Sequence, residues 1–240
     1  MQHQVTIYLL VKAEGWRPFA YPSDEAAREI KERSITIGYR ASIGDRASIG
    51  DRARIGDGAS IGDEARIDYR ASIGDGASIG DGASIGDEAR IGNEVRIGYR
   101  ASIGNEASIG YRASIGDGAS IGDGARIGDG ASIGDEARIG NEARIGYRAS
   151  IGDRASIGDG ARIGKTIFIT GSRNPVNYYG LDVIHIGCIR KTIAEWQEQY
   201  PEVGRENDYS DEQIREYGAY IQMIAELHKT WNIEVPANEA

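Results

Sequence analysis

The side chains that could act as acids, bases or nucleophiles are concentrated in one short segment towards the C-terminal end. The chain has three histidines, His3, His185 and His228, and a single cysteine, Cys188. Asp182 comes shortly before His185. A histidine beside a carboxylate can serve as a general base, and a thiolate can serve as a nucleophile. On an alternating strand, however, His185 and Cys188 would point to opposite faces, which argues against a catalytic pair.

Residues that could bind a ligand precede these candidates, namely Arg173, Asn174, Asn177 and Tyr178. The alternative interpretation is structural, with His185 as an outward or cap residue and Cys188 as a small buried hydrophobic side chain. The three histidines do not have the spacing of zinc ligands, so we expect no metal site.

A long six-residue repeat precedes this segment and must position it. Isoleucine recurs at every sixth position from Ile37 to Ile169, and alanine stands two residues before nearly every one. Alternation of Ala-x-Ile buries the alanine and the isoleucine and exposes the Ser or Arg between them. Glycine follows nearly every isoleucine, and the next two residues are polar, which is typical of a turn. Each unit is therefore predicted as a short strand and a corner, and a coil of parallel strands satisfies the pattern.

The phrase Ile-Gly-x-x-Ala-x resembles the hexapeptide repeat of left-handed β-helix proteins, the repeat shared with hexapeptide acyltransferases and γ-class carbonic anhydrases. The resemblance implies a mainly β fold, a triangular prism with about 18 residues per coil and roughly seven to eight coils over residues 35–170. It also implies a histidine base beside the coils and protruding loops in the acyltransferases, and three zinc-binding histidines in the carbonic anhydrases. No histidine or loop interrupts residues 37–169. Neither active site can be carried over to this chain.

A coil of this length sorts the outward positions into three faces, and arginine is concentrated on one of them. The members of this arginine face are Arg54, Arg90, Arg126, Arg144 and Arg162. They could form a basic stripe for an anionic partner. We favour local charge compensation on a solvated wall, because five outward arginines follow a glutamate by two residues. These pairs are Glu64/Arg66, Glu88/Arg90, Glu94/Arg96, Glu136/Arg138 and Glu142/Arg144.

Both ends of such a coil need caps, because each exposes unpaired backbone and a hydrophobic cross-section. Residues 1–34 are predicted as an N-terminal cap with a strand at 5–11 and a short helix that Ser23 caps. After the β-helix of residues 35–170, an irregular last coil and loop is predicted over 171–188. Residues 189–240 are predicted as a helical hairpin, whose first helix ends at Pro201 and whose second begins at a capping box at Ser210.

The net charge of -9 argues against binding to nucleic acid or to an anionic membrane. No apolar segment is long enough to span a bilayer, and a single cysteine permits no intrachain disulfide. We therefore expect a cytoplasmic protein that self-associates, with a homotrimer as one arrangement and a protein partner at the C-terminal helices as a further hypothesis.

The main functional interpretation is a non-catalytic repeat scaffold or interaction protein that makes its specific contacts at the C-terminal cap, without a cofactor. The alternative is a hexapeptide-type acyltransferase with an atypical site around His185 at a subunit boundary, which would use acyl-CoA. A third hypothesis is a flat serine face that binds an ordered surface such as ice or polysaccharide.

Overall fold

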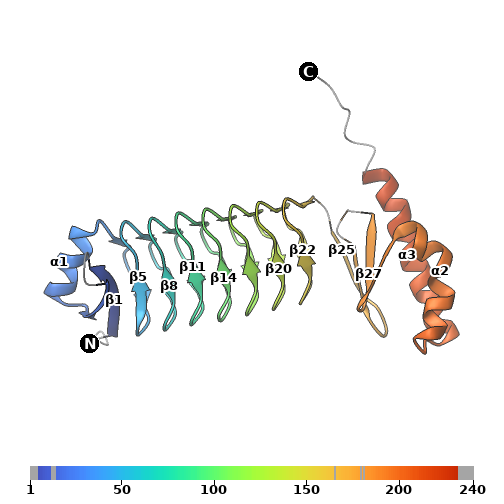
Figure 1. Cartoon of the computed structure of the whole chain (residues 1–240), viewed down its shortest axis with the longest axis horizontal. Helices are drawn as coiled ribbons and strands as arrows, with labels where there is room; N and C mark the ends of the chain where they lie inside the picture. The colour runs from blue at the N-terminus through green and yellow to red at the C-terminus, as the bar shows by residue number, and fades with distance from the viewer. Residues whose placement is uncertain (1–4, 12–14, 165, 179, 181, 232–240) are drawn as a thin grey trace, which may run out of the picture. The chain divides into compact units, whose positions relative to one another are not determined.

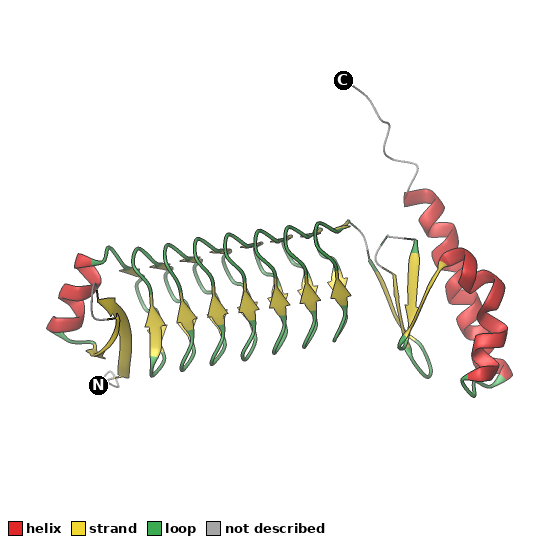
Figure 2. Cartoon of the chain, viewed as in Figure 1, coloured by secondary structure: helices red, strands yellow, loops and turns green. Residues whose placement is uncertain are grey.

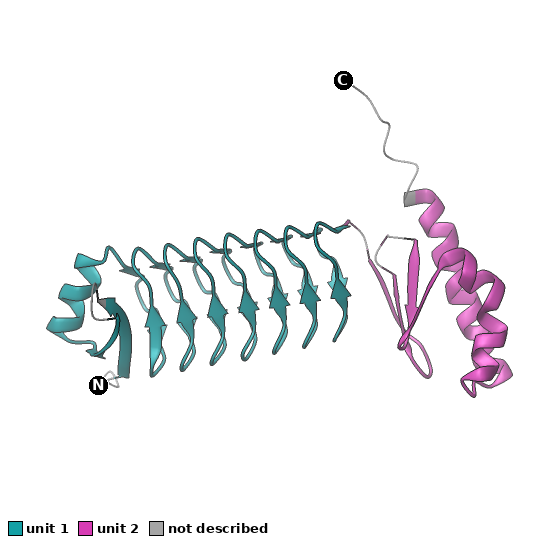
Figure 3. Cartoon of the chain, viewed as in Figure 1, with its two compact units in different colours: residues 1–162 teal, residues 163–240 magenta. Residues whose placement is uncertain are grey.

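The computed structural model divides the chain into two compact units, residues 1–162 and residues 163–240 (Figure 3). The structure describes all residues except 1–4, 12–14, 165, 179, 181 and 232–240. None of the described helices is long and apolar enough to cross a membrane.

The first unit is a left-handed parallel β-helix of about seven coils, as the repeat predicts (Figures 1 and 2). Its strands stack into three sheets. One sheet contains, in spatial order, β2 (Gly15–Tyr21), β1 (Val5–Val11), β5 (Ala47–Ile49), β8 (Arg66–Ile67), β11 (Ser84–Ile85), β14 (Ser102–Ile103), β17 (Ser120–Ile121), β20 (Arg138–Ile139) and β23 (Ser156–Ile157). The second contains β22 (Ser150–Ile151), β19 (Ser132–Ile133), β16 (Ser114–Ile115), β13 (Arg96–Ile97), β10 (Ser78–Ile79), β7 (Ser60–Ile61) and β4 (Ser42–Ile43). The third contains β24 (Arg162–Ile163), β21 (Arg144–Ile145), β18 (Arg126–Ile127), β15 (Ser108–Ile109), β12 (Arg90–Ile91), β9 (Ser72–Ile73), β6 (Arg54–Ile55) and β3 (Thr36–Ile37).

The strand register shows why the repeat specifies this coil. Each isoleucine pairs with the isoleucine one coil away, as Ile79 does with Ile97. The alanines and isoleucines fill the interior, where Ala59 is 0% and Ile61 is 2% exposed, while Ser60 between them is exposed. Identical side chains therefore meet along the axis, and every coil buries the same apolar surface.

The corners are held by a ladder of side-chain to backbone hydrogen bonds. The backbone N–H of Asp63 donates to Oδ1 of Asp81 in the next coil, at 2.9 Å. At this strand end glycine leaves room for the ladder, because a Cβ on Gly62 would lie 2.4 Å from that Oδ1. The second corner residue has a positive φ, 65° at Gly82 and 57° at Glu94. The corner aspartates thus form the turns, as predicted, and also bond one coil to the next.

The N-terminal cap is a hairpin with a helix. Strands β1 and β2 are antiparallel, and β1 continues the first sheet by pairing parallel to β5. The predicted strand at 5–11 and the helix, α1 (Asp24–Glu32), are both present, and the Ser23 hydroxyl accepts from the backbone N–H of Ala26 at 3.1 Å. Strand β2, which contains Pro18, is an addition to the predicted elements of the cap. It is an edge strand, where proline is tolerated.

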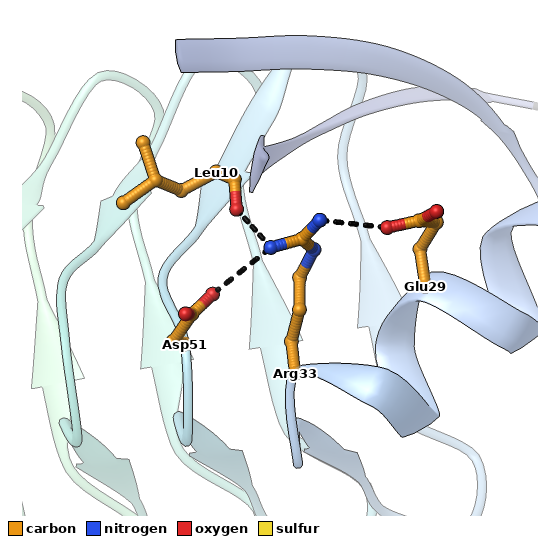
Figure 4. Close-up of polar contacts among 4 residues, drawn as sticks. All are labelled: Leu10, Glu29, Arg33 and Asp51. Carbon is orange, nitrogen blue, oxygen red and sulfur yellow. Dashed lines mark hydrogen bonds and ion pairs between the residues drawn. The ribbon is translucent and has the colours of Figure 1, made fainter. Parts of the chain in front are cut away.

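Arg33 ties the parts of this cap together (Figure 4). Its Nη1 donates to the carbonyl oxygen of Leu10 on β1 and lies 3.5 Å from Oδ1 of Asp51 at the corner after β5. Its Nη2 donates to Glu29 of α1 at 2.7 Å. The side chain is only 9% exposed. One guanidinium therefore fixes the hairpin, the helix and the first coil to one another.

The second unit is an antiparallel sheet with two helices. The strands are β25 (Ile167–Thr170), β26 (Pro175–Tyr178), β27 (Val183–Ile186) and β28 (Ile189–Thr192), in that spatial order, followed by α2 (Ile193–Glu206) and α3 (Asp211–Trp231). The core joins one sheet face to both helices. It contains Val176, Tyr178, Ile184, Ile186, Ile193, Trp196, Tyr217, Ile221, Ile224 and Ala225.

Two predictions for this region are wrong. Residues 171–188 do not form an irregular coil, because β25, β26 and β27 pair antiparallel with their sequence neighbours. The first helix neither begins at Ile189 nor ends at Pro201. It begins at Ile193 because Thr192 and Glu195 form a capping box, and Pro201 lies inside it. Packing on both sides of the proline, through Trp196 and Gly204, holds the helix together.

The second predicted helix is confirmed, with a capping box at its start. The backbone N–H of Gln213 donates to Oγ of Ser210 at 3.2 Å, and the Gln213 side chain accepts from the Ser210 N–H at 3.0 Å. Its buried residues Ile214, Tyr217, Ile221 and Ile224 recur at helical spacing and so lie on one face.

Candidate functional site

A pocket of about 130 Å³ opens within the C-terminal unit, between the sheet and the two helices. Its walls are mainly apolar, and polar groups gather at one side. The lining residues are Arg173, Asn174, Ile186, Cys188, Ile189, Trp196, Tyr200, Val203, Gly204, Asn207, Tyr209, Ile214, Tyr217 and Ile221. A concave, mostly apolar site with a few polar groups is the usual form of a small-ligand site.

Two aromatic side chains fix the walls of this pocket. Trp196 of α2 donates from Nε1 to the carbonyl oxygen of Ile184 at 2.8 Å, which joins the helix to the sheet. The hydroxyl of Tyr217 on α3 accepts from the backbone N–H of Asn174 at 2.6 Å and donates to its carbonyl oxygen at 2.7 Å. The turn between β25 and β26 is therefore held by a side chain from α3.

The polar side of the pocket is prearranged by contacts within the unit. The guanidinium of Arg173 lies 4.9 Å from the ring centroid of Tyr209, and its Nη1 donates to the carbonyl oxygen of Asp208 at 2.6 Å. Asn174 donates from Nδ2 to the Tyr209 hydroxyl at 2.5 Å. These groups can offer remaining N–H donors to a ligand without large rearrangement.

The titratable side chains on the pocket walls are one arginine, one cysteine and three tyrosines. None of the described residues that line it is a histidine, an aspartate or a glutamate. Its one thiol belongs to Cys188, which lies in the turn between β27 and β28 and is exposed. The expectation that Cys188 is a buried hydrophobic side chain is therefore wrong, because the turn places it outside the core.

His185 lies on the other face of the sheet from the pocket. Its strand neighbours Ile184 and Ile186 face the core, so His185 points away from it. In register it lies between Asn177 of β26 and Arg190 of β28. Burial, with a smaller contribution from Arg190, lowers the pKa of His185. The neutral imidazole is therefore favoured at neutral pH.

Asp182 approaches a different histidine. Its Oδ1 lies 3.9 Å from Nε2 of His228 on α3, and Nδ1 of that ring hydrogen-bonds to the hydroxyl of Tyr178. Burial, followed by the nearby Asp182 carboxylate, raises the pKa of Tyr178 to about 12. The structure thus places Asp182, His185 and Cys188 at three separate locations.

The four predicted binding residues are also divided between locations. Arg173 and Asn174 line the pocket. Tyr178 is 0% exposed in the core, and Asn177 lies on the far face of the sheet with its Oδ1 buried. Trp196 and Tyr217 belong to the core and also line the pocket.

The predicted charge compensation between Glu and Arg two residues apart is wrong. The structure instead pairs corner residues across neighbouring coils, because the positive φ of the corner directs their side chains along the edge of the prism. The pairs are Arg46–Glu64 at 3.4 Å, Arg70–Glu88 at 3.0 Å, Arg112–Glu94 at 2.7 Å and Arg154–Glu136 at 3.0 Å. Among the described residues, the outward strand arginines take no part in these cross-coil pairs. Arg66 instead forms an ion pair with Asp68 at 2.7 Å.

No metal centre is formed by the described residues, since no three of their His, Cys, Asp or Glu side chains are placed to hold an ion.

Family models match parts of the repeat. A model described as "Bacterial transferase hexapeptide (six repeats)" matches residues 130–165, and one described as "Hexapeptide repeat of succinyl-transferase" matches residues 40–68 and 100–135. No curated protein matches the chain in sequence.

Several solved structures are similar to this chain. The UDP-N-acetylglucosamine acyltransferase from Campylobacter jejuni is 18% identical with a TM-score of 0.47, over 78% of this chain and 81% of that one. The acetyltransferase domain of PglB from Neisseria gonorrhoeae, in complex with acetyl coenzyme A, is 17% identical with a TM-score of 0.37, over 58% and 62%. PerB from Caulobacter crescentus is 19% identical with a TM-score of 0.36, over 55% and 59%. At these identities the likeness concerns the fold alone.

Proposed function

We propose that this hexapeptide-repeat, left-handed β-helix protein is a non-catalytic binding protein, in which the coils form a rigid support and the C-terminal unit holds a small, mainly apolar ligand. The observation that carries the proposal is the pocket beside Trp196 and Tyr217, with its apolar walls and its donors on one side. The ligand is a free small molecule or an aromatic or branched side chain of a partner.

The coils fit the role of a support. Backbone N–H groups donate to carbonyl oxygens one coil away, as Gly80 does to Ile97 at 2.7 Å. The outward residues of the described two-residue coil strands are serine, arginine and threonine. These side chains supply no general base at neutral pH, since arginine stays protonated.

The size of the pocket limits what it can hold. A cavity of about 150 Å³ lined by apolar side chains takes up a single aromatic ring. The pocket of about 130 Å³ therefore suits one ring or one branched alkyl group. A hydroxyl or carbonyl on that group would meet the donors of Arg173 and Asn174.

A titration of the full chain tests this proposal with p-cresol, indole and isoamyl alcohol as probes. The reporter is the indole N–H resonance of Trp196, because its donor bonds to Ile184 at the pocket wall. We expect saturable shifts with at least one probe. Ile189→Phe should fill the pocket and abolish them. Ile169→Phe is the matched control, since Ile169 packs on the same core but does not line the pocket. Absence of saturable binding by all three probes would overturn the proposal.

The second candidate function is acyl transfer from an acyl-CoA. The matched family models are described as transferase repeats, and these descriptions favour acyl transfer over a binding protein. His185 is the residue that could serve as base, because its lowered pKa favours the neutral imidazole. It would take a proton from an acceptor amine or hydroxyl as that group attacks the thioester carbonyl, and the CoA thiol would leave.

Release of free CoA from acetyl-CoA, with a panel of amino sugars as acceptors, tests this candidate. We expect none from a binding protein. Turnover that His185→Gln abolishes and Asn177→Ala retains would establish the transferase and displace the first proposal.

A further inference from the structure

We propose that Arg126, Arg144 and Arg162 form a binding row for an acidic polysaccharide on the third sheet of the β-helix. The three residues occupy consecutive strands, β18, β21 and β24. Arg126 and Arg144 are in direct register. All three side chains are exposed. At a strand spacing of about 4.8 Å, the row spans roughly 10 Å.

The row lacks internal charge compensation. Among the described residues, no carboxylate lies within ion-pair distance of these three guanidinium groups, whereas corner arginines such as Arg112 are paired. Like charges directly opposite one another on neighbouring strands destabilise a sheet. Elsewhere in this sheet a serine separates the arginines, as Ser72 does between Arg54 and Arg90. Repulsion between the adjacent guanidinium groups therefore destabilises the sheet locally, and a bound anion would reduce that repulsion.

The corner beside the row adds a cation and an aromatic ring. Tyr147 follows strand β21 and is 63% exposed. The Cζ of Arg148 lies 4.8 Å from its ring centroid, and no described carboxylate forms an ion pair with Arg148. An exposed aromatic ring next to guanidinium groups suits an acidic sugar. The ring can pack on the apolar face of a pyranose, and a guanidinium group can bind the carboxylate of the sugar bidentately.

The charge around the row selects the kind of anion. The corners on either side of these strands carry Asp123, Glu142, Asp159 and Asp129. Double-stranded DNA carries a charge for about every 1.7 Å of its axis, so its phosphates would also meet those carboxylates. A polymer whose carboxylates are separated by neutral hydroxylated rings can place its anions on the guanidinium groups alone. We therefore favour a uronic-acid polymer over a nucleic acid. The inference does not depend on the pocket of the C-terminal unit.

The test compares two triple variants of the full chain for binding to polygalacturonate. R126S/R144S/R162S removes the row, and serine is the residue that the same sheet already carries at Ser72 and Ser108. R54S/R96S/R138S removes the same charge from positions whose strand neighbours are serine or threonine. Thermal unfolding checks that both variants keep the fold.

We expect the row variant to bind polygalacturonate at least about tenfold more weakly than the unmodified chain, and the control variant less than about threefold more weakly. Neutral dextran should not bind. Equal weakening in both variants would show a general charge effect and overturn the proposal. So would the absence of polygalacturonate binding by the unmodified chain, or equally tight binding of a DNA duplex.

Discussion

The β-helix and the C-terminal unit are stabilised in different ways. In the coils, each inward isoleucine meets the isoleucine one coil away, as Ile91 meets Ile109. In the C-terminal unit each contact is made once, and residues distant in sequence hold it together, as Tyr217 holds the backbone of Asn174. A repeated contact can be lost at one coil and kept in the others. A unique contact has no substitute, so the two regions should respond differently to the same kind of mutation.

Trp196→Ala should give the largest effect. Trp196 is 3% exposed and is hydrogen-bonded to Ile184, so its removal should destabilise the C-terminal unit by about 3–5 kcal/mol. Calorimetry should show the C-terminal transition lowered or lost, with the β-helix transition unchanged. A single transition that moves as a whole would contradict the independence of the two units.

Gly116→Ala should give an intermediate effect inside the coils. Its Cβ would lie 2.4 Å from Oδ1 and 2.6 Å from the backbone nitrogen of Asp135, so the corner must shift at a cost of about 1–3 kcal/mol. Gly158→Ala is the matched control, because the same repeat position there has nothing within 4 Å. Denaturant unfolding measures both. Equal losses would show that backbone flexibility, not corner packing, decides the role of these glycines.

A small, pH-dependent effect is expected at Glu216. Hydrogen bonds from the side chain and backbone of Ser172 lower the pKa of Glu216. Because the folded-state pKa is lowered, the stabilisation is present above the ordinary value of 4.5 and is lost as the pH falls through the folded-state pKa. Glu216→Gln should therefore reduce the loss of stability of the C-terminal unit as the pH falls. The pH dependence of the stability of the β-helix should not change. An unaltered pH dependence of the C-terminal unit would exclude this role for Glu216.

Deletion of residues 71–88 should have the smallest effect on the ability of the chain to fold. It removes one whole coil and joins Arg70 to Ala89, which keeps the repeat in phase. We expect a shorter protein that still unfolds cooperatively, as circular dichroism and size-exclusion chromatography can show. Loss of cooperative unfolding would show that the coils are not interchangeable.

The same contrast explains what the sequence could predict. The coils, the Ser23 cap and the Ser210 capping box depend on residues close in sequence or on a strict period, and all were predicted. The antiparallel sheet was missed because the alternation around Ile184 and Ile186 fits a strand of either sheet type. Its strands pair with their sequence neighbours, and the helices that cover one face follow later in the chain, so the alternation alone does not reveal the antiparallel arrangement.

The candidate sites were predicted in part. Arg173 and Asn174 do line the pocket, but its apolar walls come from helices whose packing no local pattern reveals. The five arginines of the arginine face lie on one sheet, and the predicted charge compensation by glutamates two residues earlier is wrong. That error came from the corners, since the positive φ of residues such as Glu94 directs their side chains to the next coil instead of the following strand.

The corner ladder has a direction, and this bears on how the chain is made. Oδ1 of Asp45 accepts the N–H of Thr6 in the N-terminal hairpin, and Asp63 in turn accepts the N–H of Asp45. Each coil is therefore completed by the coil synthesised after it. A chain that emerges from the ribosome can therefore add coils in order on the N-terminal hairpin, and each new coil satisfies the corner N–H groups of the coil before it.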